Sequence, residues 1–476
     1  MHLSLRILAL IAITTLGAPA AVHAGQPQKR PNVLFLFSDD QRADTIGALG
    51  NQHIRTPNLD RLVKRGTSFT RAYCMGSMQG AVCVPSRAML LSGRTLFRVP
   101  GDLKGVTTWP EMFARAGYRT FMTGKWHNGQ ASALRTFMLG KSIFFGGMGD
   151  PYELPVADIT DKRTLTDTRK SGKHSVELFA DSAIDFIRAQ KGADQPFLAY
   201  VAFNLPHDPR VAPKEYHDFY NKKKKPPLPP NFLPEHPFNN GPEIIGRDEK
   251  LAPWPRTSDV VRQHLADYYA AITFMDAQIG RILEALRVAG LLENTIVVFA
   301  SDSGLAIGSH GLFGKQNLYD HSMRVPLIVA GRFIPVNQQR HGMCYLLDIF
   351  STLGDLCGVE YPKDNEGRNL VGLLSGRVSR GRDELFFVYR DVQRAVRDDR
   401  WHLIVYPQIN HRQLFDLQDD PHETKDLSQD PAHAARVARM TATLVRLQSE
   451  YGDKQPLTVA KPLPREFDFS KVPAGK

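Results

Sequence analysis

Three acidic residues stand just after two strongly apolar segments of the chain. Asp39 and Asp40 follow the run Asn32 to Phe37, and Asp302 follows Thr295 to Ala300. Taken alone, Asp39 and Asp40 also suit a turn that caps a helix. Three carboxylates brought together would repel unless a cation lay among them, and oxygen donors select a hard ion over zinc. The pattern therefore predicts a site for Ca²⁺, with Mg²⁺ as the alternative.

Basic and imidazole side chains follow other apolar runs in the same way. Lys125 and His127 come shortly after one such run, and His207 comes after another. Together with Lys315, these groups suit the binding of a tetrahedral anion and the protonation of a leaving group. Each histidine taken singly also suits a structural role.

A cysteine precedes one of the predicted helices. Cys83 lies just before the segment Pro85 to Ser92, whose free N–H groups would favour a negative charge. The simplest interpretation is a thiol nucleophile of low pKa. The sequence shows no adjacent base and orienting group of the kind that a cysteine hydrolase uses, so this interpretation leaves the chemistry incomplete.

These polar groups need a framework that brings strand ends together. Short β-rich runs alternate with amphipathic stretches, which is typical of an α/β fold with a mixed, mostly parallel sheet sandwiched by helices. Ligands of such sheets bind outside the carboxyl ends of the strands, so we expect one shared cleft. Strands are predicted over 32–37, 118–122, 197–203, 295–300 and 326–330, and helices over 57–66, 85–92, 174–190 and 260–288, the last with Ser258 as N-cap.

The pattern changes near residue 376. Close-set short strands (385–389, 394–396 and 402–406) and a helix over 432–451 follow that point. We therefore expect a catalytic α/β domain over 25–375 and a smaller antiparallel α+β subdomain over 376–476. The proline-rich segment 221–257 fits neither a core helix nor a central strand, and we expect it to wall the site together with 128–165.

The first 24 residues have the pattern of a secretory signal peptide. Arg6, an apolar run of ten residues and a small-residue end before Gly25 predict export to the periplasm or the medium. No apolar run is long enough to predict a transmembrane segment. The four cysteines are too few for a disulfide scaffold, and Cys344 and Cys357, about 20 Å apart on a predicted helix over 343–356, should not pair.

The chain is basic. It has 476 residues, with 60 Lys and Arg against 49 Asp and Glu, and a net charge of +11. The basic residues are scattered, apart from the run Lys222 to Lys225, and a local anion site accounts for those near the predicted cleft. Nucleic acid is therefore not expected as a partner.

Two separated segments resemble the signatures of a known family. The run Cys83 to Arg87 with Leu91 to Arg94 is similar to the first signature of the formylglycine-dependent (type I) sulfatases, which belong to the alkaline phosphatase-like superfamily. The run Gly117 to His127 is similar to the second signature. The resemblance extends over nearly the whole chain after residue 24, as far as the segment 414–421.

The resemblance implies that a formylglycine-generating maturation enzyme converts Cys83 to formylglycine. Of the two hydroxyls of the hydrated aldehyde, one would attack sulfur and the other would allow sulfate to be released. The implied site residues are Asp39, Asp40, Cys83, Asp302 and Ser303 for the metal, Arg87 to hold the formylglycine, Lys125 and Lys315 for the sulfate oxygens, His207 to protonate the leaving oxygen, His127 to support the nucleophile, and His310 to reach the substrate.

One position departs from the family pattern, because Ser303 stands where the family usually has Asn or His after the metal-binding Asp302. The leading hypothesis is an exported sulfatase that hydrolyses a sulfate ester, with a carbohydrate as the expected substrate and Trp126 as an aromatic residue near the cleft. The alternatives are a phosphonate or phosphate monoester hydrolase on the same fold and a non-catalytic binder of sulfated glycans.

Overall fold

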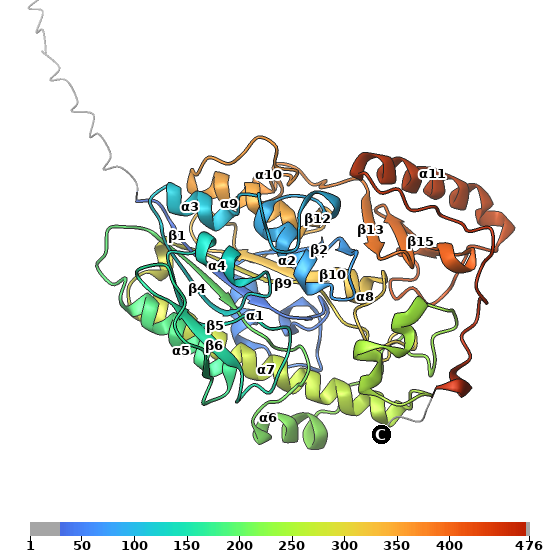
Figure 1. Cartoon of the computed structure of the whole chain (residues 1–476), viewed down its shortest axis with the longest axis horizontal. Coiled ribbons are helices and arrows are strands. Elements are labelled where there is room, and N and C mark those ends of the chain that lie inside the picture. The colour runs from blue at the N-terminus through green and yellow to red at the C-terminus, as the bar shows by residue number, and fades with distance from the viewer. Residues whose placement is uncertain (1–28, 473–476) are drawn as a thin grey trace, which may run out of the picture.

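The computed structural model describes residues 29–472, in which helices pack around two β-sheets (Figure 1). The larger sheet has 11 strands, ordered β11-β2-β10-β9-β1-β8-β4-β5-β6-β7, with β12 paired to β2. Its strands are β1 Asn32–Ser38, β2 Gly66–Tyr73, β4 Arg119–Lys125, β5 Leu139–Phe144, β6 Pro155–Ile159, β7 Arg169–Lys170, β8 Phe197–Ala202, β9 Thr295–Ser301, β10 Arg324–Ala330, β11 Gln338–Arg340 and β12 Cys344–Tyr345. The predicted signal segment, 1–24, lies outside the described residues.

The centre of this sheet is parallel. Strand β1 pairs in parallel with β8 and β9, and β4 pairs in parallel with β8 and β5, whereas β10 and β6 run antiparallel to their neighbours. The predicted α/β class with a mixed, mostly parallel sheet is therefore confirmed. Parallel strands end at the same edge, so their carboxyl ends lie side by side.

Both faces of the sheet are covered by helices. Along β1, Val33, Phe35 and Phe37 belong to one apolar cluster, and Leu34 and Leu36 belong to the other, as the alternation of side chains in a strand requires. Figure 1 shows α5 and α7 on one side of the sheet and α3 and α9 on the other. The helices are α1 Pro57–Arg65, α2 Cys83–Ser92, α3 Trp109–Arg115, α4 Gln130–Thr136, α5 Ser175–Arg188, α6 Lys214–Asp218, α7 Ser258–Val288, α8 Asp320–Met323, α9 Ile349–Cys357, α10 Val371–Leu374 and α11 Ala434–Tyr451.

The second sheet lies beside α11 (Figure 1). Its strands are β3 Gly76–Ser77, β13 Leu385–Tyr389, β14 Gln393–Arg397, β15 Trp401–Tyr406 and β16 His411–Asp416. The three predicted strands form an antiparallel meander with a fourth, β16, that was not predicted, and β3 adds to it in parallel from a segment just before α2. The second sheet is thus tied directly to the catalytic part of the chain, and the boundary at residue 376 stays a prediction.

Several local expectations need correction. Helix α7 does begin at Ser258, but its N-cap is Thr257, whose side chain accepts a hydrogen bond from the Val260 N–H at 3.3 Å. The segment 343–356 is not one helix, because β12 and a 3-10 turn precede α9. Strands β2, β5 and β6 are absent from the expected set, since polar residues interrupt their apolar pattern. Within residues 29–472, no helix combines the length and apolar character needed to cross a membrane.

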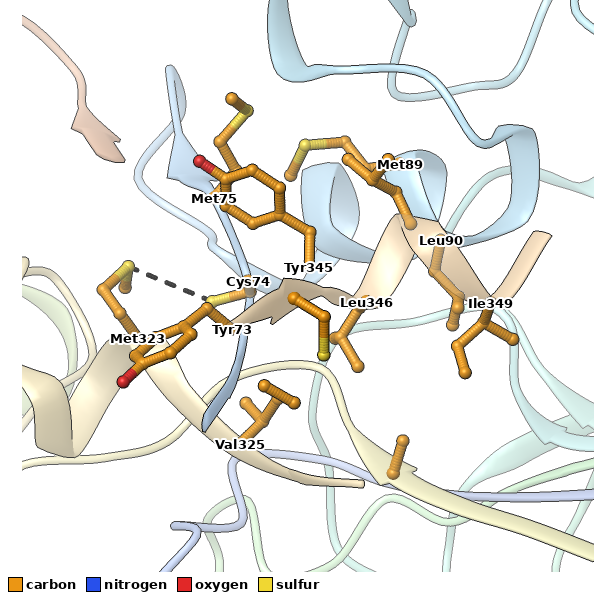
Figure 2. Close-up of a cluster of buried hydrophobic side chains, with 14 of the residues drawn as sticks. Tyr73, Cys74, Met75, Met89, Leu90, Met323, Val325, Tyr345, Leu346 and Ile349 are labelled. Carbon is orange, nitrogen blue, oxygen red and sulfur yellow. Dashed lines mark hydrogen bonds between the residues drawn. The ribbon is translucent and has the colours of Figure 1, made fainter. Parts of the chain in front are cut away.

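All four cysteines are buried and free. Figure 2 shows Cys74 in an apolar cluster, where its Sγ lies 3.9 Å from Met323 Sδ. Tyr345 and Leu346, from β12 and the turn after it, pack in the same cluster. Cys74 therefore behaves as a small apolar side chain, and the expected lack of a Cys344–Cys357 bridge is confirmed.

Candidate active site

The carboxyl ends of β1, β4, β8 and β9 bring the predicted polar residues together. Ser38, the last residue of β1, is in register with Ser301, the last residue of β9. Asp39 and Asp40 therefore emerge beside Asp302. The edge of the sheet, rather than sequence proximity, assembles this cluster.

The three carboxylates are fully buried, and a hydrogen bond links Asp40 to Asp302. Asp302 Oδ1 accepts from the Asp40 N–H at 3.0 Å, and Asp302 Oδ2 accepts from Arg87 Nε at 2.9 Å. Ser303 Oγ donates to Asp40 Oδ1 at 2.9 Å. Asp40 has a φ of 63°, a left-handed conformation that is uncommon outside glycine. The surrounding hydrogen bonds hold this backbone in place, as is common at functional sites.

Cys83 is the first residue of α2, and Arg87 lies one turn later on the same face. Cys83 Sγ lies 3.2 Å from His127 Nδ1. Burial raises the pKa of the Cys83 thiol, and the nearby charges of Lys125 and Lys315 do not offset this effect. The structure therefore contradicts a thiolate of low pKa as the nucleophile.

Two buried lysines approach the carboxylates. Lys125, at the end of β4, contacts Asp39 Oδ2, and Lys315 Nζ lies 2.5 Å from Asp40 Oδ2. Burial alone would lower the pKa of Lys315, but the carboxylates of Asp40 and Asp248 outweigh it and raise that pKa well above its ordinary value. Lys315 is therefore a permanent positive charge inside the protein.

The two site histidines have different surroundings. His207 Nδ1 donates to the Asp208 backbone carbonyl at 2.8 Å, which leaves Nε2 3.7 Å from Asp40 Oδ2. Burial, helped by Lys125, lowers the pKa of His127 to about 3. His127 is thus a neutral imidazole beside Cys83, whereas His207 turns one ring nitrogen toward the carboxylates.

The carboxylates also differ from one another in acidity. Burial opposes ionisation of Asp39, but Lys125 and Arg87 outweigh it and hold the pKa of Asp39 well below its usual range. At Asp302, burial and then the charge of Asp39 raise the pKa to about 6. Such opposed shifts within one buried cluster are typical of functional sites.

The described residues fit a hard divalent cation. Asp39, Cys83 and Asp302 each place a ligand atom within 4.8 Å of the others, and so do Asp39, Asp40 and His207. Among residues 29–472, no group donates a hydrogen bond to the buried Asp39 Oδ1. Three carboxylates offset three cationic side chains here, so an added divalent cation would leave a positive site that attracts an anion. The cationic side chains are Arg87, Lys125 and Lys315.

Two residues named in the sequence analysis lie in other surroundings. His310 is 6% exposed, stacks on Tyr319 and approaches Asn231 with its Nε2 at 3.0 Å, so its ring is engaged outside the carboxylate cluster. Trp126 is 1% exposed and packs edge-on against Phe137, and its indole N–H donates to Ser132. Trp126 is therefore a core residue, and the expectation of a cleft aromatic there is wrong.

One residue near the cluster is absent from the predicted set. Asp248 lies in a 3-10 segment, Arg247–Leu251, within the proline-rich segment 221–257, which is called the excursion below. Gln316 Nε2 donates to Asp248 Oδ2 at 3.1 Å. Gln316 directly follows Lys315, so the excursion reaches the cluster, as expected for a wall of the site. From the sequence, Asp248 could have been suspected only because it lies in the segment expected to wall the site. Nothing in the residue spacing links Asp248 to Lys315.

The strand ends of a mostly parallel sheet thus gather buried carboxylates, lysines and imidazoles, an arrangement suited to binding an anionic ester. The model of the sulfatase family matches residues 31–359, and that of the N-sulphoglucosamine sulphohydrolase C-terminal region matches 308–450. The chain therefore belongs to the sulfatase family, and it is a sulfuric ester hydrolase.

Relatives with assigned names agree with this membership. The chain is 25% identical to an N-acetylglucosamine-6-O-sulfatase of Bacteroides thetaiotaomicron, over 93% of this chain and 91% of that protein. It is 29% identical to an arylsulfatase of Clostridium perfringens, over 88% and 94%.

Solved structures share the fold. A protein in complex with its substrate D-glucosamine-2-N,6-O-disulfate superposes with a TM-score of 0.73 and 23% identity, covering 90% of this chain and 99% of that chain. A phosphonate monoester hydrolase of Agrobacterium radiobacter has a TM-score of 0.69 and 22% identity, covering 89% and 96%. At these identities the likeness concerns the fold alone.

Proposed function

We propose that this chain is an exported sulfatase that hydrolyses a sulfate ester of a carbohydrate, with formylglycine made from Cys83 and with Ca²⁺, or Mg²⁺, as its cation. The observation that carries the proposal is the position of Cys83, at the N-terminus of α2 and within ligand distance of Asp39 and Asp302. Export rests on the predicted signal segment.

The cation would be held by Asp39, Asp40, Asp302 and the modified side chain at position 83. When bound, it supplies positive charge that orients the nucleophile and stabilises charge on the sulfate ester. Ser303 would act through Asp40, since its hydroxyl donates to the carboxylate of that residue. Arg87 neutralises Asp302 from the opposite side and donates to the Lys125 carbonyl at 2.9 Å, which braces the site.

Formylglycine at position 83 would supply a hydrated aldehyde with one hydroxyl to attack sulfur and one to release sulfate. The raised pKa of the unmodified thiol supports a need for this modification, because a neutral buried thiol is a poor nucleophile. His127, neutral and 3.2 Å from Sγ, is placed to accept a proton from the hydroxyl group there.

The remaining residues would handle the ester itself. The ammonium groups of Lys125 and Lys315 would bind sulfate oxygens. His207 would protonate the leaving oxygen from Nε2, since its Nδ1 proton is already donated to a backbone carbonyl. Both lysines are sealed from solvent, so their charges act at low dielectric and hold an anion strongly.

A carbohydrate is the substrate class that the relatives favour. The names of similar proteins include an N-acetylglucosamine-6-O-sulfatase and an ulvan-active sulfatase, and one structural neighbour was solved with a glucosamine disulfate. Membership of the sulfatase family supports catalysis over a purely glycan-binding role. A phosphonate monoester hydrolase remains the alternative on the same fold.

The test begins with the tryptic peptide Ala72 to Arg87, isolated from cells that contain the maturation enzyme. Its mass should be that of the lighter formylglycine form. Purified protein should then release sulfate from 4-nitrophenyl sulfate and from sulfated sugars, lose this activity to a chelator and regain it with Ca²⁺. Only unmodified Cys83 and no sulfate release would contradict the proposal, and faster hydrolysis of a phenylphosphonate ester would favour the alternative.

A further inference from the structure

Asp248 lies beside the residues proposed to bind and protonate the substrate. It is 7% exposed, and Gln316 Nε2 donates to its Oδ2 at 3.1 Å. A Cβ placed on Gly314 would come 3.1 Å from Asp248 Cβ. The carboxylate therefore packs against the segment Gly314 to Gln316, which contains Lys315.

The carboxylate of Asp248 is charged and incompletely used. Burial would raise its pKa, but the positive charges of Lys315 and His207 hold it below its ordinary value. Within residues 29–472, Gln316 is the only residue whose side chain or N–H donates to Asp248, and Oδ1 accepts from none. A nearly buried carboxylate usually has more hydrogen-bond partners, so this oxygen is free for a ligand.

The neighbouring residue fixes this arrangement. Glu249 accepts hydrogen bonds from the N–H groups of Phe313 and Gly314, at 2.8 to 3.0 Å, and its carboxylate lies 2.8 Å from Arg256. These contacts hold the segment Arg247–Leu251 against the loop that contains Lys315. Asp248 is therefore held in position before any substrate arrives, which favours selective recognition.

We propose that Asp248 selects the substrate by accepting a hydrogen bond from a hydroxyl or amino group on the carbon next to the sulfate ester. This inference rests on the proposed function. His207 would protonate the leaving oxygen and Lys315 would bind a sulfate oxygen, and Asp248 packs against the segment that contains Lys315, within reach of the charge of His207. The alcohol part of the substrate would then lie near Asp248. A fixed carboxylate there also repels a second anionic group on the adjacent carbon.

Two small esters test this without knowledge of the natural substrate. Catechol monosulfate has a hydroxyl beside the ester, whereas phenyl sulfate has none. We expect Asp248→Asn to lower kcat/KM for catechol monosulfate by about 10–100-fold, which is the contribution of a hydrogen bond to a charged group. The kcat/KM for phenyl sulfate should change by less than about threefold, because phenyl sulfate has no hydroxyl to make that hydrogen bond. Glu235→Gln, which removes a charge from the same excursion, is the matched control and should change neither.

Equal losses on both esters would overturn the inference, since Asp248 would then only position Lys315 or the fold. Unchanged rates on both esters would overturn it as well. Inhibition by inorganic sulfate separates these roles further, because a displaced Lys315 would weaken sulfate binding and a lost hydroxyl contact would not.

A binding measurement separates this inference from the proposed function. In a Cys83→Ser background, which carries no formylglycine, calorimetry with monosulfates of glucose, galactose and N-acetylglucosamine should show Asp248→Asn weakening the tightest ligand about 10-fold or more. Failure of the wild type to carry formylglycine would contradict the proposed function alone. Equal affinity with and without Asp248 would contradict the inference.

Discussion

Two regions of this molecule bury ion pairs, and they do so differently. In the second sheet, Arg394 of β14 donates to both carboxylate oxygens of Asp453, at 2.6 and 3.0 Å, and to a backbone carbonyl, while Gln448 and the Gln455 N–H also donate to Asp453. This pair is saturated with hydrogen bonds. Every side-chain nitrogen of Arg394 and both carboxylate oxygens of Asp453 already have hydrogen-bond partners, so none is available to a ligand.

The carboxylate cluster of the large sheet is not saturated. Asp39 Oδ1, Arg87 Nη2 and Lys125 Nζ are sealed from solvent and make no regular hydrogen bond with residues 29–472. Leaving buried charged atoms in that state costs free energy that the Arg394–Asp453 pair avoids. Hydrogen-bond saturation, rather than burial or charge alone, therefore separates the structural Arg394–Asp453 pair from the candidate ligand site.

The largest expected effect comes from removing one charge in the unsaturated cluster. Asp302→Asn keeps an oxygen to accept from the Asp40 N–H but removes the charge opposite Arg87. We expect sulfate ester hydrolysis to be abolished while circular dichroism still shows a folded protein. Activity within tenfold of wild type would mean that the cluster does not hold the cation.

Breaking the saturated pair should affect stability instead. Asp453→Ala leaves Arg394 buried without its carboxylate partner, which should lower the free energy of unfolding by about 3–5 kcal/mol. Urea denaturation measures this, and kcat/KM of the remaining folded protein should stay unchanged. A double variant, Arg394→Met with Asp453→Ala, should lose less than the single one; a larger loss would refute the account of an unpaired charge.

A third buried carboxylate, Asp276 of α7, sharpens the comparison through pH. It accepts hydrogen bonds from the N–H groups of Asn58 and Leu59 at the start of α1, and no Lys, Arg or His between residues 29 and 472 forms an ion pair with it. Burial raises its pKa to about 6. The stability that its proton contributes is fully present below about pH 4 and is lost as pH rises through about 6.

The stability of wild type relative to Asp276→Asn should therefore fall by on the order of 2–3 kcal/mol between pH 4 and pH 6.5. Urea titrations of both proteins across this range give the difference directly, and shifts common to both cancel. A difference that rises with pH would show that the hydrogen bonds from α1 outweigh burial.

The smallest effect is expected at Ser303. Because its hydroxyl supports Asp40, Ser303→Ala should lower kcat/KM by about 10–100-fold and weaken the affinity for Ca²⁺ in parallel, as is typical when a group behind a metal ligand is removed. Ca²⁺ titration of the purified variants provides the measurement. A loss as complete as that of Asp302→Asn would argue that Ser303 binds the cation directly.

Much of the framework could be predicted from the sequence. The strands that end at Ser38, Lys125, Ala202 and Ser301 were located to within three residues, because their apolar runs are long and bounded by polar groups. Strand β2 was missed, since polar residues occupy several of its positions. The division of the site between four strand ends follows from the rule that parallel strands share an edge.

The site could be predicted only in part. Asp39, Asp40, Cys83, Lys125 and His127 stand in or beside short runs whose spacing carries information. His310 lies in a loop and Asp248 in a short 3-10 segment, and the direction of such side chains depends on what packs against them. His310 turned toward Tyr319, and Asp248 turned toward Gln316.

The sequence by itself determined the class of the protein. The alternation of strands and helices and the two separated signatures are both patterns among residues close together in the chain. The sequence also determined which charges follow which strands. Only the tertiary structure decided how those charges meet: that Ser303 supports Asp40, that Cys83 faces a neutral His127, and that a carboxylate from a proline-rich excursion lies beside Lys315. The physical reason is that local periodicity sets which residues are buried, whereas long-range packing sets which buried atoms touch.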